Sequence, residues 1–94
     1  MRVLVIEDDK KIASFIVKGL KQAGFAVDHA ANGEDGIHLA LHESYDAAVI
    51  DIMLPKLDGL SLIEEIRRKK LNTPVIILNN FTKSYKRFFM LQDL

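Results

Sequence analysis

The sequence predicts an α/β protein built on a doubly wound parallel sheet, and three observations support this prediction. Four short apolar runs of strand length occur at residues 3–6, 25–27, 47–50 and 75–78. These runs are continuously apolar, as is typical of parallel strands covered on both faces. Stretches with the apolar spacing of a helix separate them. The resulting β-α-β-α-β-α-β order implies right-handed crossovers that place helices on both faces of the sheet.

The three predicted helices are marked by apolar residues three or four positions apart and by their boundary residues. The first has Gly24 as a stop signal. Its apolar face comprises Ile12, Phe15, Ile16, Gly19, Leu20 and Ala23. The second pattern is weaker and comprises Ile37, Ala40 and Leu41. The third comprises Leu62, Ile63 and Ile66, and Asp58 is its candidate N-cap.

Length and composition exclude several classes of protein. The chain has 94 residues, which is one domain at most. Its 13 basic and 13 acidic side chains cancel, which argues against a dedicated nucleic-acid module, because such modules carry a basic excess. The absence of cysteine excludes disulfides and thiolate metal sites. The charge is unevenly placed: six basic against ten acidic residues through Leu60 give −4, and seven against three afterwards give +4.

Apolar segments long enough for a membrane are missing from the sequence. No run approaches the roughly 18 residues that a spanning helix needs. The N-terminal run at residues 3–6 is too short for a signal peptide, and acidic residues follow it. We therefore expect a cytoplasmic protein with no membrane partner.

Acidic residues follow two of the predicted strands. Glu7 and Asp8 come directly after the first, and Asp51 comes directly after the third. If these strands are neighbours, three carboxylates meet at one edge of the sheet, where a hard cation such as Mg²⁺ would neutralise them. An Asp there could accept a phosphoryl group. The alternative is that these acids are solvated loop ends, with Asp8 or Asp9 capping a helix.

Two motifs carry a resemblance to a known family. The segment DIMLPKLDG occupies residues 51–59, and VIEDD occupies residues 5–9. Together they resemble the receiver domain of two-component response regulators, especially the type found in winged-helix (OmpR-type) transcription regulators. The resemblance runs from Arg2 to about Leu78 and implies a flavodoxin-like (CheY-like) fold over residues 1–78.

The resemblance also implies roles for individual residues. Asp51 would be the phosphoacceptor, and Glu7, Asp8, Asp51 and the backbone carbonyl of Met53 would hold Mg²⁺. The partner would be a sensor histidine kinase, and the chain itself would not be an enzyme. In a full-length regulator, phosphorylation changes dimerisation and DNA binding by an attached domain. We expect this chain to bind no nucleic acid directly.

The family pattern stops after Leu78. Receivers place Thr or Ser and then Ala at the end of the fourth strand, where this chain has Asn79 and Asn80. An Asn79 amide could still contact phosphate. The usual last strand with its Lys, and the usual last helix, have no counterpart in the sequence. The chain therefore resembles a C-terminally truncated receiver, and we expect an open fourth strand and a dimer or larger assembly.

Residues 79–94 are predicted to be a helical tail outside the family pattern. Positions 81, 85, 88 and 92 would share one helical face. The favoured interpretation is a truncation, frameshift or rearrangement product whose helix covers exposed apolar surface. One alternative is a partner-binding or swapped segment. Another is that Lys83 replaces the missing Lys.

Two rival functions and one weak metal motif complete the sequence-based predictions. The chain could be an unphosphorylated interaction protein that titrates a kinase or a full-length regulator. A phosphohydrolase is disfavoured, because Met53 stands where such enzymes carry a second acid. His38 and His42 are one helical turn apart and could chelate a metal, but no third ligand is evident, which favours an exposed helix face.

Overall fold

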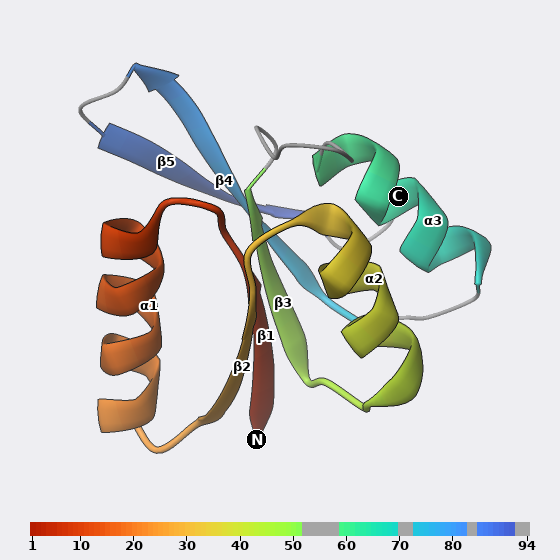
Figure 1. Cartoon of the computed structure of the whole chain (residues 1–94), viewed down its shortest axis with the longest axis horizontal. Helices are drawn as coiled ribbons and strands as arrows, with labels where there is room; N and C mark the ends of the chain where they lie inside the picture. The colour runs from red at the N-terminus through yellow and green to blue at the C-terminus, as the bar shows by residue number, and fades with distance from the viewer. Residues whose placement is uncertain (52–58, 70–72, 83–84, 92–94) are drawn as a thin grey trace.

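The computed structural model describes residues 1–51, 59–69, 73–82 and 85–91 of the chain (Figure 1). Strands and helices alternate as predicted through the fourth strand, and a fifth strand follows directly. The elements are β1 (Arg2–Ile6), α1 (Lys10–Gln22), β2 (Ala26–Ala30), α2 (Gly33–His42), β3 (Ala47–Asp51), α3 (Gly59–Arg68), β4 (Val75–Thr82) and β5 (Tyr85–Leu91).

The five strands form one sheet in the order β2-β1-β3-β4-β5. Neighbours among the first four strands run parallel, whereas β5 runs antiparallel to β4. The predicted doubly wound parallel fold is therefore confirmed. In the part of the chain that the structure describes, no fifth parallel strand and no helix follow β4, which agrees with the predicted incompleteness.

Helices cover the two faces of the sheet unequally. Figure 1 shows α1 on one side and α2 and α3 together on the other. The larger core cluster lies beneath α2 and α3 and includes Leu4, Ile6, Ile50 and the apolar face of α3. Among the described side chains, the smaller cluster has three buried members, Val3, Val5 and Val49, and residues of α1 pack on them. Among the residues whose side chains are described, the face under α2 and α3 therefore holds the larger buried cluster.

The boundaries of the first two helices follow from capping residues. The Asp9 side chain accepts a hydrogen bond from the Ile12 amide at 3.0 Å and so caps α1. Gly24, just after α1, has a φ of 96°, a left-handed conformation that glycine adopts without strain. Asn32 caps α2 by accepting from the Asp35 amide at 2.9 Å. The candidate cap Asp58 lies outside the described residues.

Helix α2 lies close to β1 at Gly36. A Cβ built at this position would lie 2.9 Å from Ile6 Cγ1 and 3.2 Å from Ile6 Cγ2. Ile6 is fully buried at the end of β1, so its side chain has little room to move. The glycine therefore allows α2 to pack directly on the strand that carries the first acidic residues.

The predicted helix in residues 79–94 is wrong. Residues up to Thr82 continue β4, and Tyr85–Leu91 form β5. Because only two residues separate the strands, their connection allows an antiparallel hairpin but not a parallel crossover. The aromatic-rich segment favours a strand, and pairing with β4 satisfies backbone groups along most of its length, with an irregularity between Asn79 and Thr82. The prediction that β4 is an open edge is also wrong, because β5 covers that edge.

Candidate functional site

Three carboxylates meet at the carboxyl end of the parallel sheet. In the pairing of β1 with β3, Ile6 lies opposite Ile50. Glu7 and Asp51 each follow these paired residues by one position, so the topology places them at the same level. Carboxylate oxygens of Glu7, Asp8 and Asp51 all lie within 4.8 Å of one another. The structure thus brings together the three acids that the sequence singles out.

The burial of the three acids differs, and this decides how the cluster can work. Glu7 is 0% exposed and Asp51 is 1% exposed, whereas Asp8 is exposed. Two buried carboxylates this close are costly unless hydrogen bonds or a cation compensate their charge. One such bond comes from the Asp9 amide, which donates to Glu7 Oε2 at 3.1 Å. The exposed Asp8 leaves the cluster open to solvent on one side.

This donor set fits a magnesium ion. Mg²⁺ prefers oxygen ligands, is usually held by one or two carboxylates, and keeps several of its waters. The cluster offers carboxylate oxygens, and its exposed side leaves room for water. Among the residues that the structure describes, the cluster contains no nitrogen or sulfur ligand, which would favour a softer ion.

The backbone of Glu7 is held in place by β2. The Glu7 amide donates to the Ala30 carbonyl at 3.0 Å. The Glu7 carbonyl accepts a hydrogen bond from His29 Nε2 at 2.8 Å. The contact depends on the β1–β2 register, in which Val5 lies opposite His29, so the sequence alone does not show it. His29 therefore belongs to the surroundings of the site as a positioning residue.

The remaining predicted site residues are placed less fully. Met53, the predicted carbonyl ligand, lies outside the described residues, as does Pro55. Asn79 lies in β4, one position beyond Leu78, which pairs with Asp51. Its backbone position is therefore at the level just after Asp51, on the neighbouring strand.

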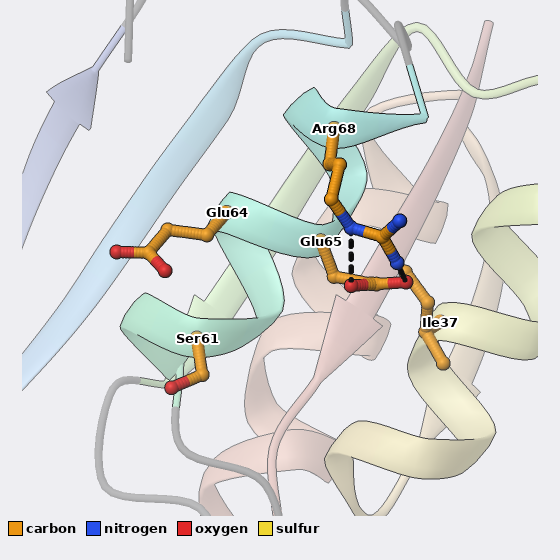
Figure 2. Close-up of a pocket in the computed structure, with 5 residues that line it drawn as sticks. All are labelled: Ile37, Ser61, Glu64, Glu65 and Arg68. Atoms are coloured by element: carbon orange, nitrogen blue, oxygen red, sulfur yellow. Dashed lines mark hydrogen bonds and ion pairs between the residues drawn. The ribbon is translucent and has the colours of Figure 1, made fainter.

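A hollow lies between α2 and α3 (Figure 2). Its volume is about 470 Å³, and it is lined by Ile37, Ser61, Glu64, Glu65 and Arg68. Arg68 and Glu65, one helical turn apart, form an ion pair there, with Arg68 Nε donating to Glu65 Oε2 at 3.2 Å. This pair neutralises the charges of Glu65 and Arg68 within α3, and Glu64 adds a further carboxylate to the lining.

Comparison with known proteins identifies the fold. Residues 3–92 match the family model of the response regulator receiver domain. The chain belongs to this receiver family. The predicted family is confirmed, and the match extends beyond Leu78, where the motif resemblance ends.

The curated relatives of this receiver are longer transcriptional regulators. It is 45% identical over 78 residues to the probable transcriptional regulatory protein SilR of Salmonella typhimurium, covering 83% of this chain and 34% of that protein. It is 42% identical over 87 residues to the transcriptional regulatory protein DltR of Streptococcus agalactiae, covering 93% of this chain and 39% of that protein. The receiver thus spans about a third of the length of the curated relatives it matches.

Solved receivers share the fold. The receiver domain of Francisella response regulator 1452 superposes with a TM-score of 0.82 at 42% identity, covering 88% of this chain and 69% of that one. The response regulator TrrA from Thermotoga maritima, solved in complex with Mg²⁺ and BeF, gives a TM-score of 0.77 at 33% identity, covering 81% and 66%. The longest helix among the described residues, α1 with 13 residues, is too short to cross a membrane.

Proposed function

We propose that this receiver accepts a phosphoryl group from a histidine kinase onto Asp51, with Mg²⁺ held at the acidic cluster. The observation that carries the proposal is the convergence of Glu7, Asp8 and Asp51 within 4.8 Å at the carboxyl end of the sheet. In the transfer, an Asp51 carboxylate oxygen forms a bond to phosphorus while the bond between phosphorus and the donor breaks. The product is an acyl phosphate on the chain itself.

The acids around Asp51 would make this transfer possible. Glu7 and Asp8 would hold the ion together with Asp51, and the Met53 carbonyl is the proposed fourth protein ligand. When bound, Mg²⁺ supplies positive charge that offsets the repulsion between carboxylates and phosphoryl oxygens. Burial of Asp51 keeps its carboxylate in one place beside β1. The hydrogen bond from His29 to the Glu7 carbonyl would fix the backbone next to the ion.

Two solved structures support this proposal by analogy. The TrrA response regulator was solved with Mg²⁺ and BeF. Another structure contains TrrA in complex with the histidine kinase ThkA, and it matches this chain with a TM-score of 0.79 at 31% identity, covering 88% of this chain and 72% of that one. Receivers of this family thus meet kinases, and a cytoplasmic location would suit such a partner.

Intact-mass measurement tests the proposal directly. The wild-type chain is incubated with Mg²⁺ and a small phosphodonor, and a mass gain of one phosphoryl group is expected. Asp51→Asn should show no gain, because it removes the attacking oxygen while keeping the side-chain size. Glu7→Gln should slow the gain by weakening the hold on Mg²⁺. A gain that persists in Asp51→Asn would contradict the proposal.

The same experiment tests the proposal that the chain is not an enzyme. A receiver takes up phosphate once per molecule, so phosphodonor consumption should stop at about one equivalent apart from slow hydrolysis. Continuous release of phosphate from a phosphoester would instead support the phosphohydrolase alternative. We further propose that phosphorylation here is poorly coupled to switching, because Asn79 replaces the hydroxyl residue of the family pattern.

A second candidate function is pairing with another copy of the chain or with a full-length regulator. Its support is β5, which is the last strand in the sheet order and an edge strand among the described residues. An unpaired strand edge is a template for another strand. Antiparallel pairing of two β5 strands would bury both edges and give a symmetric dimer.

The exposed face near α1 is a less suitable dimer surface. An apolar hollow of about 290 Å³ lies there, lined by Phe15, Ile16, Gly19, Leu20, Val49 and Ile76. Phe15 is 81% exposed, but Lys10, Lys11 and Lys18 surround it, so two such faces would repel each other. Light scattering over a wide concentration range tests for dimers, and a monomer at every concentration would contradict this second candidate.

A further inference from the structure

The two histidines of α2 form a close pair on the surface. His38 and His42 are one helical turn apart, and both are exposed. Their ring centroids lie 4.2 Å apart, and the ring planes are inclined by 33°. Histidines at this spacing on one helix face are a known arrangement for binding zinc. The pair plays no part in the acidic cluster, which lies at the ends of β1 and β3.

A hydrogen bond decides which nitrogen of His42 is available. His42 Nδ1 lies 2.7 Å from the backbone carbonyl oxygen of His38. Because a carbonyl oxygen can only accept, Nδ1 must carry the proton and donate. In the neutral ring the other nitrogen, Nε2, then holds the free lone pair. Metal-binding histidines commonly donate their second ring nitrogen to a backbone carbonyl in this way, which fixes the ring and its tautomer.

We propose that His38 and His42 form a bidentate zinc site on α2, distinct from the magnesium site. Two imidazole nitrogens suit Zn²⁺, whereas Mg²⁺ prefers oxygen ligands. Helix α2 already holds both rings near each other. Binding of Zn²⁺ by the second ring therefore costs little further conformational entropy once the first ring has bound it. The site would therefore select ions of a different class from those held by Glu7, Asp8 and Asp51.

The rest of the coordination shell is open. Among the described residues, the one cluster of three or more potential ligands within reach of one another is the acidic cluster, so no third side chain joins the histidine pair. Zn²⁺ usually takes four ligands, so two positions would be left for water. Binding through two side chains is reversible and of moderate strength. At the sequence level, the missing third ligand favours an exposed helix face without a metal. In the structure, the missing ligand limits the affinity for Zn²⁺ but does not prevent chelation by the two histidines.

Imidazole NMR during a Zn²⁺ titration tests this inference. Mg²⁺ in excess is present throughout and competes with Zn²⁺ for the acidic cluster. Of the three histidines, His29, in β2, contacts the Glu7 carbonyl, so its signals report any Zn²⁺ that reaches the acidic cluster. We expect the ring ¹⁵N signals of His38 and His42 to shift together at the same Zn²⁺ concentrations, while those of His29 stay in place. A shift of one ring alone, or of neither, would overturn the proposal.

Single variants provide the affinity measurement. His38→Gln and His42→Gln should each weaken Zn²⁺ binding by about 100-fold or more, the gain expected from joining two weak ligands. Equal Zn²⁺ affinity in a variant and the wild type would overturn the bidentate site. Both residues are exposed, so we expect both variants to fold, and circular dichroism can check this. The NMR titration uses the wild-type chain and does not depend on either variant. Phosphorylation of Asp51 is measured separately and can fail without affecting this result.

Discussion

The close approach of α2 to β1 makes Gly36→Ala an informative substitution. The new methyl group would lie 2.9 Å from Ile6 Cγ1, closer than real Cβ contacts come, and Ile6 is fully buried. Overpacking of this kind costs about 1–3 kcal/mol. Alanine in place of glycine within a helix returns about 0.8–1 kcal/mol. We expect a net loss of about 1 kcal/mol in the free energy of unfolding, and a Tm lower by about 4–8 °C for a domain of this size.

Gly19→Ala is the matched control. Gly19 also lies inside a helix, α1, but a Cβ added there meets nothing within 4 Å. The same substitution should therefore raise the free energy of unfolding by about 0.8–1 kcal/mol. The difference between the two variants isolates the packing cost against Ile6. Urea denaturation followed by circular dichroism measures both values, and equal changes at the two glycines would refute close packing of α2 on β1.

Three further predictions concern the magnesium site, a helix cap and an acid-sensitive network. Mg²⁺ should stabilise the fold by about 2.7 kcal/mol at 100 times its Kd, and Asp51→Asn should remove most of this gain in thermal melts. Asp9→Ala should cost about 1 kcal/mol by removing the hydrogen bond to the Ile12 amide, whereas Asp9→Ser should retain most of the stability. The Tyr45 hydroxyl donates to Asp28 at 2.7 Å, and this bond, helped by Arg2, lowers the pKa of Asp28 below its ordinary 3.8. The stabilisation is therefore full above pH 3.8 and is lost as the pH falls through the lowered pKa. Tyr45→Phe should accordingly destabilise the protein less at about pH 3 than at about pH 6, and a loss that is constant with pH would contradict this reasoning.

Much of the parallel fold could be predicted because local and tertiary preferences agree there. The apolar face of α1, the cap at Asp9 and the stop at Gly24 all act within a few residues, so the sequence shows them directly. The continuous apolar runs at β1 and β3 reflect burial on both faces, which a parallel sheet requires. In these elements the local pattern and the finished structure favour the same conformation.

The C-terminal segment could not be predicted in the same way. Its apolar positions fit a helical face, but β4 offers a whole strand of backbone partners to a segment two residues further along the chain. This tertiary pairing outweighs a local helical preference. A pattern of aromatic residues alone does not show which preference wins.

The acidic cluster was predictable because a parallel sheet brings the carboxyl ends of adjacent strands together. Glu7 and Asp51 need no further information beyond strand adjacency. The role of His29 was not predictable, because its bond to the Glu7 carbonyl depends on the exact pairing of β2 with β1. The His42 hydrogen bond was likewise hidden, because spacing along a helix says nothing about ring tautomers.

The antiparallel direction of β5 has a practical consequence for attaching the protein to a surface. Leu91 pairs with Val75 at the start of β4, so β5 ends at the edge of the sheet opposite the acidic cluster. Met1 lies at that same edge, where its carbonyl accepts from the Ala26 amide. An affinity tag joined before β1, or a linker joined after β5, would start on the side facing away from Asp51. Immobilisation through either end should therefore leave the phosphorylation pocket facing the solution, ready for a kinase flowed over the surface.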